Sequence, residues 1–224
     1  MRSVLCALLA AAGIAGAAGL DGVSNRDAAA GVKQALSQAS DAAVAKLGVE
    51  NGFFGNEKLR IRAPESLHRV EAVIRATGLD RQADELVLAM NRTAEAAVPE
   101  AKAFVMGAIR NMKVQEPKKI LEAGGSAATD DFRATSYEPL ATRLLPVVRK
   151  AGASVRLVEK HNAIARHGKK IGLVKPDELT IEQHVTRKML DGLFATIGEE
   201  EKALRKDPPS ARSKAVQKLF EAVR

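Results

Sequence analysis

The chain has 224 residues, of which 46% are hydrophobic, 28% charged and only 3% aromatic. This length is enough to bury a core, and apolar residues recur through almost all of it, which excludes a disordered chain. Few segments are rich in the β-branched and aromatic residues that strands favour, so the abundant alanine and leucine predict closely packed helices.

The N-terminal residues 1–18 have the pattern of a targeting segment. Arg2 supplies a short positive region, the run from Val4 to Ala18 is apolar, and small residues at 15–17 offer a cleavage site. We therefore predict a signal peptide and export to the periplasm. The alternative is an alanine-rich core helix, but the glycines within the run disfavour a helix. The run is too short to span a bilayer and no later stretch approaches the required length, so we expect no transmembrane span in the mature chain.

Cysteine chemistry is not expected in the mature protein. Cys6 is the only cysteine, and Ser3 and Leu5 do not fit the positions before a lipoprotein cysteine. Removal of the signal peptide would leave no thiol, which excludes disulfides and thiolate catalysis.

Positive charge is concentrated towards the C-terminus. Residues 19–142 carry 16 basic and 17 acidic side chains, whereas residues 143–224 carry 18 basic and 10 acidic ones, a net charge of +8. Such an asymmetry favours contact with an envelope protein or an anionic membrane surface. Charge alone would also permit nucleic acid, but export argues against it.

In chain order, the first helix is predicted over residues 27–47, where apolar residues recur at helical spacing. Residues 49–64 are the least helical part of the chain. Asn51-Gly52 and Gly55-Asn56 mark turns, and the sequence is compatible with a loop anchored by apolar side chains or with one short hairpin near residues 51–62. Pro64 is suited to the first position of the next helix, which Gly78 would end.

Further helices are predicted over residues 80–97 and 101–112, separated by Pro99, and over a short segment beginning at Pro117. Residues 126–150 have a helical pattern that Pro139 and Pro146 would bend or break. A helix over residues 154–167 is followed by a basic loop. Thr180 and Gln183 form a capping-box pattern that opens a long helix ending near residue 207, and a short helix ends the chain. The fold class is therefore all-α, a single compact bundle of about eight or nine helices over residues 19–224.

The predicted helix over 80–97 carries a polar stripe. Asp84, Asn91 and Glu95 are spaced to share one helical face, and Arg92 lies beside them. Such a stripe either lines a pocket or forms a partly buried ion-pair network that fixes the packing of the helix.

A second polar group comes from two segments further along the chain. Arg187 and Asp191 are spaced as an i, i+4 pair, and Arg133 is a candidate partner for Asp84 or Glu95. Gly192 within the same predicted helix indicates a close contact with a neighbouring helix. The run Glu199-Glu200-Glu201 is predicted to be a solvated face.

The densest basic patch includes Arg166, His167, Lys169 and Lys170. It would dock on a phosphate-bearing surface or merely keep the protein soluble. The four histidines are scattered, and no phosphate-binding loop, zinc-protease motif or nucleophile elbow is present. We therefore predict no metal site, no cofactor and no catalytic residue.

Several segments together resemble a known family, the bacterial domain of unknown function 4197. They are N-G-F-F-G-N (51–56), P-E-S-L-H-R-V-E (64–71), A-D-E-L-V-L-A-M-N-R-T-A-E-A-A-V-P-E-A-K (83–102), A-A-T-D-D-F-R (127–133), V-T-R-K-M-L-D-G-L-F (185–194) and E-E-E-K-A-L-R-K-D-P (199–208). The resemblance implies an exported helical protein and no assigned reaction. His184 and Asp131 stand where the family leads us to expect aromatic residues, which counts against an aromatic-lined ligand site.

Three functions follow as hypotheses. The first is a non-enzymatic periplasmic protein that binds a partner or an anionic envelope component through its basic C-terminal part. The second is a helical carrier of a small apolar or amphipathic ligand, oriented by Arg92 and Glu95. The third is a hydrolase that uses Asp84, Glu95 or Asp191.

Overall fold

The structure, a computed structural model, describes residues 19–65, 67, 80–170 and 180–223, with only the backbone for residues 167–170. The predicted signal peptide over residues 1–18 and most of the helix predicted after Pro64 lie outside the described residues.

The described residues form seven α-helices and two short 3-10 helices, and they contain no strand. The helices are α1 (Asn25–Leu47), α3 (Asp80–Asn111), α4 (Pro117–Ala123), α5 (Ala127–Ser154), α6 (Leu157–Lys170), α7 (Ile181–Lys206) and α8 (Lys214–Ala222), and the 3-10 helices span Leu20–Gly22 and Pro208–Ser210. The all-α prediction is confirmed. The helix count is slightly lower than predicted, in part because α3 is one helix where two were expected.

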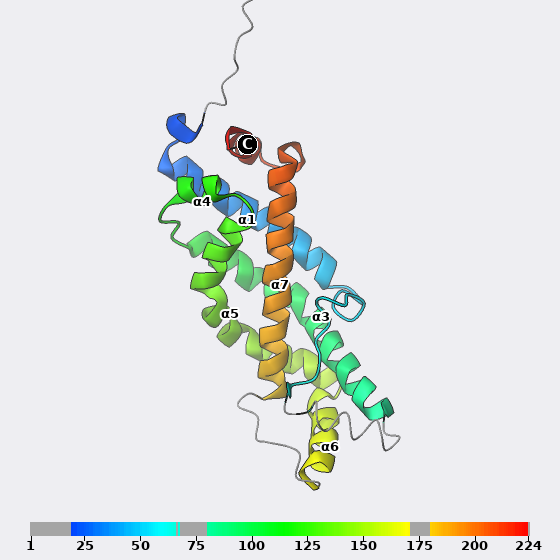
Figure 1. The fold of residues 1–224 in the computed structure, drawn as a ribbon. Helices are drawn as coiled ribbons and strands as arrows, with labels where there is room; N and C mark the ends of the chain where they lie inside the picture. Colours follow the sequence, from blue (N-terminus) through cyan, green and yellow to red (C-terminus); the bar gives the residue numbers. More distant parts are fainter. Residues whose placement is uncertain (1–18, 66, 68–79, 171–179, 224) are drawn as a thin grey trace, which may run out of the picture.

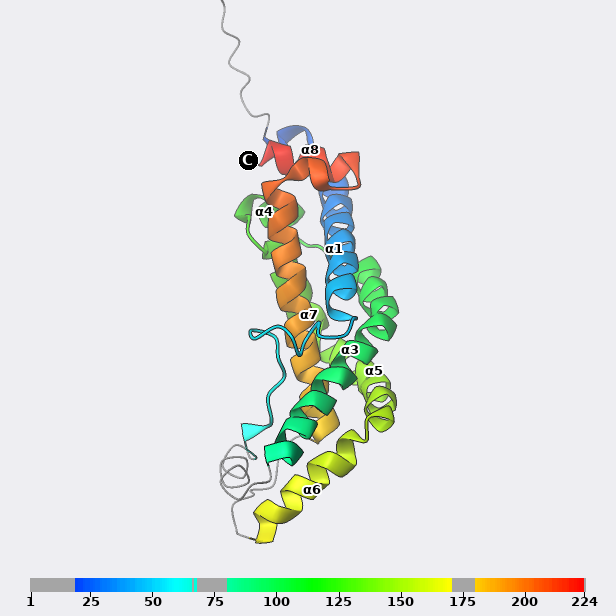
Figure 2. The ribbon, with the colours of Figure 1, turned by 90° about the vertical axis from the view of Figure 1, so that its right-hand side faces the viewer.

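Helix α7 lies at the centre of the molecule. It packs against α1 and α5, and α3 packs against both of these helices. Figures 1 and 2 show α8 across one end of the structure, beside the first turns of α1 and the last turns of α7, while α6 lies at the opposite end.

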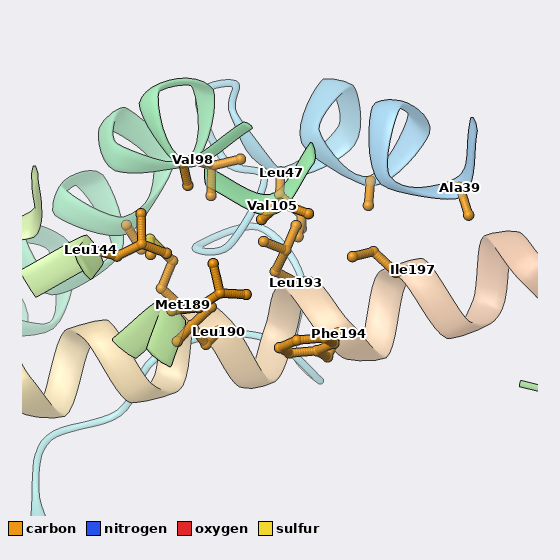
Figure 3. Close-up of a cluster of buried hydrophobic side chains, with 14 of the residues drawn as sticks. Ala39, Leu47, Val98, Val105, Leu144, Met189, Leu190, Leu193, Phe194 and Ile197 are labelled. Atoms are coloured by element: carbon orange, nitrogen blue, oxygen red, sulfur yellow. The ribbon is translucent and has the colours of Figure 1, made fainter. Parts of the chain in front are cut away.

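One cluster of buried apolar side chains joins these helices. Figure 3 shows its central part, where Leu193 and Ile197 of α7 face Leu47 of α1 and Val105 of α3. The buried positions of α7 recur every three or four residues, which is the spacing that keeps one helical face towards a core. Each fully buried aliphatic side chain contributes about 1.5–3 kcal/mol.

Three prolines lie inside helices without ending them. Pro99 is within α3, and Pro139 and Pro146 are within α5. A break at Pro99 was predicted because proline lacks a backbone donor. That prediction is wrong. Pro99 is exposed, while Val98 and Ala101 beside it are completely buried, so core packing on the opposite face holds the helix together.

The start of α7 agrees with its sequence pattern. The Thr180 hydroxyl accepts a hydrogen bond from the Gln183 N–H at 3.3 Å, and the Gln183 side chain accepts one from the Thr180 N–H at 2.8 Å. The predicted capping box is therefore confirmed. None of the helices in the described part of the chain combines the length and apolar character that crossing a bilayer requires.

Candidate functional site

Residues 48–65, which connect α1 to the following segment, form a loop that lies against both α3 and α7. Figure 2 shows this loop leaving α1 and running beside α7. The hairpin predicted near residues 51–62 is wrong, because the backbone makes successive turns there. The N–H of Gly52 bonds to Val49, that of Gly55 to Asn51, and that of Arg60 to Asn56. Asn51 adopts a positive φ of 67°, a value that asparagine tolerates in turns.

The polar stripe on α3 holds this loop in place. Asn91 is completely buried; its carbonyl oxygen accepts a hydrogen bond from the Ile61 N–H at 2.9 Å, and its amide donates to the Ile61 carbonyl at 2.9 Å. The Glu95 side chain is 4% exposed and accepts hydrogen bonds from the N–H groups of Phe53 and Phe54 at 3.0 and 2.9 Å. These contacts satisfy backbone groups that have no partner in a helix or a sheet.

Arg92 completes the network at the loop. Its guanidinium donates to the second oxygen of Glu95, and also to Glu50 and Asn51 at 3.0 Å each. Asp84 is exposed on the same helix and takes no part in these bonds. Of the two interpretations of the stripe, the geometry favours the structural network for Asn91, Arg92 and Glu95.

Arg133 and Asp191 meet between α5 and α7. The Arg133 guanidinium donates to Asp191 at 2.7 Å, so its partner is not the predicted Asp84 or Glu95. Arg187 pairs with Glu138 of α5 at 2.9 Å, not with Asp191 one turn further along its own helix. Both predicted pairings are therefore corrected, because side chains on neighbouring helices lie closer than the partners we expected from the sequence.

Tyr137 donates its hydroxyl hydrogen to Asp191 at 3.1 Å and lies under the Arg133 guanidinium, which is 5.2 Å from the ring centre. Burial, followed by the negative charge of Asp191 and its hydrogen bond, raises the pKa of Tyr137 to about 12. The phenol therefore stays neutral and acts as a hydrogen-bond donor at physiological pH.

Glu201 is the clearest case in which the prediction from the sequence is wrong. It belongs to the predicted solvated run of glutamates but is completely buried. Its carboxylate accepts hydrogen bonds from the N–H groups of Ala128 and Thr129 at the start of α5, and from the Arg205 guanidinium. Arg205 also donates to two carbonyls at the end of α4, so the Glu201–Arg205 pair connects α4, α5 and α7.

A groove lies between residues 58–65 of the loop and α7. We call it the basic groove; it has a volume of about 650 Å³ and is lined by Lys58, Leu59, Arg60, Ile61, Arg62, Ala63, Glu65, His184, Lys188, Asp191, Gly192 and Ala195. Four of these side chains are cations and two are carboxylates. One of the carboxylates, Asp191, is already paired with Arg133.

An adjoining groove of about 640 Å³ continues along α7 towards the start of α5 and shares Lys58, Leu59 and Ala195 with the basic groove. Apart from the shared Lys58, its cations have acidic partners: Lys46 pairs with Glu200, Lys202 with Glu199 at 2.9 Å, and Arg133 with Asp191 at 2.7 Å. It therefore presents no excess positive charge comparable with that of the basic groove.

Among the described residues, three cations of the basic groove have no acidic partner. Lys58 and Arg62 on the loop and Lys188 on α7 are exposed, and none of them forms an ion pair in the described part of the chain. Arg60 donates to the Phe54 carbonyl at 2.7 Å and lies over the Phe54 ring. Positive charge from two separate elements therefore converges on one groove.

Sequence analysis did not identify Lys58, Arg62 or Lys188. The alternation of basic and apolar residues from Lys58 to Ala63 was the available signal, because it predicts an extended segment with one basic face. Nothing in the sequence around Lys188 indicates that this residue faces the loop, because only the tertiary structure brings the two together.

The predicted basic patch is described only in part. Arg166 is exposed on α6, whereas the side chains of His167, Lys169 and Lys170 lie outside the described residues. No group of three or more histidine, cysteine, aspartate or glutamate side chains is placed to hold a metal ion within the same described ranges.

Comparison with known proteins identifies the family but no activity. The chain matches the family described as "Protein of unknown function (DUF4197)" over residues 22–221. Searches against curated proteins and against solved structures find no match. Because the matched region covers far more than half of the chain, the chain belongs to the DUF4197 family.

Proposed function

We propose that this protein is a non-enzymatic binding protein of the periplasm, and that the basic groove holds an anionic partner or an anionic part of the cell envelope. The signal-peptide pattern of residues 1–18 supports the location. The groove supports the binding role, since its lining combines positive charge with apolar side chains such as Leu59 and Ala195.

The observation that carries this proposal is the absence of acidic partners for Lys58, Arg62 and Lys188 within the described residues, although most other cations around α7 are paired. Exposed pairs contribute little to stability, so leaving these cations unpaired costs little. Their convergence instead creates a positive potential that attracts anions.

The two alternative functions have less support. An enclosed apolar carrier site would bury most of its ligand, whereas the basic groove is open to solvent along one side. A hydrolase would need a carboxylate placed to act on a substrate. Both oxygens of Glu95 already accept hydrogen bonds, Asp191 is paired with Arg133, and Asp84 lines neither of the two grooves.

Anilinonaphthalenesulfonate provides a direct test, because it joins a sulfonate to apolar rings and fluoresces when it leaves water. We compare the wild type with a groove variant that combines Lys58→Gln, Arg62→Gln and Lys188→Gln. A control variant combines Lys113→Gln, Lys214→Gln and Lys218→Gln, which removes the same charge from exposed positions outside the groove.

We expect the probe to bind the wild type and the control variant, and to bind the groove variant about tenfold more weakly, because three attractions of a few tenths of a kcal/mol are lost. Added salt should weaken binding to the wild type. Equal binding to all three proteins, with unchanged circular dichroism, would reject the groove as the anion site.

A further inference from the structure

The segment Arg60–Ala63 forms one wall of the basic groove, and its residues alternate between exposed and buried. Arg60 and Arg62 are exposed, whereas Ile61 and Ala63 are buried. Alternation with a period of two residues is the side-chain pattern of a β-strand. The segment therefore has the form of a single strand without a partner strand.

One edge of this segment is already occupied. The N–H and C=O of Ile61 both bond to the Asn91 side chain on α3, as they would to a neighbouring strand. In an extended chain, the backbone groups of the next residue point to the opposite edge. The Arg62 carbonyl does so, since it accepts a hydrogen bond from His184 of α7 at 2.9 Å.

On the edge that faces α7, two backbone groups have no partner among residues 19–65, 67, 80–170 and 180–223. The Arg62 N–H and the Arg60 C=O form no hydrogen bond within the described part of the chain. These two groups flank Ile61. In a parallel pair, one residue of the incoming strand donates its N–H to the Arg60 carbonyl, and its own carbonyl accepts from the Arg62 N–H. An antiparallel partner would need both backbone groups of Arg60 or both of Arg62. The Arg60 N–H already donates to the Asn56 carbonyl at 2.7 Å, and the Arg62 carbonyl already accepts from His184.

We infer that the basic groove binds an acidic peptide segment in an extended conformation, paired parallel to Arg60–Arg62. Strand addition supplies affinity through the main chain, and alternate side chains supply specificity. The peptide residue opposite Ile61 would direct a small apolar side chain inward, towards Ala195. Its two neighbours would be acidic, and would lie near Arg62, Lys58 and Lys188.

This inference rests on the proposed function and adds to it the chemical class of the partner. The probe is the peptide acetyl-Glu-Val-Glu-Val-Glu-amide, measured by its displacement of anilinonaphthalenesulfonate. A matched peptide carries one N-methyl group on the backbone of the first valine and another on that of the second. It has the same charge but cannot donate the hydrogen bond to Arg60. A third peptide replaces every glutamate with lysine.

We expect the acidic peptide to displace the dye from the wild type and the control variant. Its affinity should fall about tenfold in the groove variant, and about fivefold when the backbone is methylated, which corresponds to one lost hydrogen bond. The lysine peptide should not displace the dye. Because the methylated peptide is tested on the unchanged protein, this comparison does not depend on the folding of a variant.

Several results would overturn the inference. Equal affinity of the methylated and unmethylated peptides would exclude strand pairing. Groove-dependent binding of phosphatidylglycerol vesicles without binding of the peptide would identify a membrane surface as the partner. If the dye binds in the groove and the peptide does not, the proposed function stands and the peptide inference fails. If neither binds there, both fail.

Discussion

Glu201 and Arg205 form a buried ion pair that connects three helices through backbone groups. The side chain of Glu201 is 0% exposed and that of Arg205 is 10% exposed. Moving charges out of water is costly, so such a pair persists only where hydrogen bonds satisfy the remaining polar atoms. Here the start of α5 supplies two N–H donors, which also carry the positive end of the helix dipole.

Replacement of Glu201 by alanine should therefore destabilise the protein strongly. We expect Glu201→Ala to lower the free energy of unfolding by about 3–5 kcal/mol, because the Arg205 charge and two backbone donors lose their acceptor. Urea denaturation followed by circular dichroism measures this change. The matched control is Glu199→Ala, which removes a side chain that is 72% exposed and should change stability by less than about 0.5 kcal/mol. Similar values for both variants would show that Glu201 is not buried.

Tyr137 allows its own ionisation to be followed, because it is the only tyrosine and the chain has no tryptophan. Burial and Asp191 raise its pKa from 10.0 to about 12, so we expect tyrosinate absorbance to appear near pH 12. A raised pKa means that the neutral form is favoured in the folded state. Its contribution to stability is complete below about pH 10 and is lost as the pH rises from 10 to 12.

The Asp191→Asn substitution tests the cause of this shift. It should lower the pKa of Tyr137, because the negative charge of Asp191 favours the neutral phenol, while burial, the largest cause, remains. Ultraviolet titration measures both midpoints. A midpoint near 10 in the wild type would contradict the placement of Tyr137 between α5 and α7.

Some of the residues that build or support the candidate site could be predicted from the sequence and others could not. Asn91, Arg92 and Glu95 were identified together because a helix fixes the relative positions of its own side chains. Glu201 was missed, since a run of three glutamates gives no local sign that one of them faces the core. Lys188 was missed because its neighbours across the groove come from a loop far away in the sequence.

At the scale of elements, the loop of residues 48–65 is positioned by two helices at once. Phe53 of the loop is completely buried and packs against Gly192 of α7. A Cβ atom at Gly192 would lie 2.6 Å from the Phe53 ring, which is closer than van der Waals contact permits. The glycine predicted from sequence to mark a close approach therefore does so, and its partner is an aromatic ring rather than another helix.

Gly192→Ala should accordingly be destabilising. Alanine is the better helix former by about 1 kcal/mol, but overpacking the core costs about 1–3 kcal/mol. Gly107→Ala in α3 is the matched control, because a Cβ atom there would meet only the end of the Arg110 side chain, 3.9 Å away, and it should stabilise the protein by up to about 1 kcal/mol. Thermal unfolding measures both. Stabilisation by Gly192→Ala would show that Phe53 does not occupy this position.

Amide hydrogen exchange tests the second attachment of the loop, the hydrogen bonds between Ile61 and Asn91. Asn91→Ala removes both hydrogen bonds to Ile61, so exchange should become faster in residues 57–63 while the helices remain protected. Asn111→Ala, at the exposed end of α3, serves as the control and should leave exchange in the loop unchanged. Unchanged protection in the Asn91→Ala protein would mean that other contacts hold the loop.

Helix boundaries were predicted well where local chemistry determines them and poorly where the core does. The capping box at Thr180 lies within four residues, so the sequence shows it directly. The break predicted at Pro99 is wrong, because the local cost of the proline is outweighed by the burial of nearby Val98 and Ala101. The turns of the loop were expected, whereas its attachment to α3 depends on the tertiary structure.

At the scale of the whole molecule, the helices hold the loop of residues 48–65 in a fixed position beside α7. Helix α7 forms part of the core through one face and part of the basic groove through another. The groove exists because Asn91 and Glu95 hold the loop beside α7. It is positively charged because Lys58, Arg62 and Lys188 have no acidic partners among the residues that the structure describes.

The most direct test of this account is native mass spectrometry of the protein purified from the periplasm at low salt. We predict that the wild type and the control variant carry an added mass that high salt removes, and that the groove variant does not carry it. An added mass retained equally by the groove variant, or no added mass on any of the three proteins, would contradict the claim that the basic groove is the binding site.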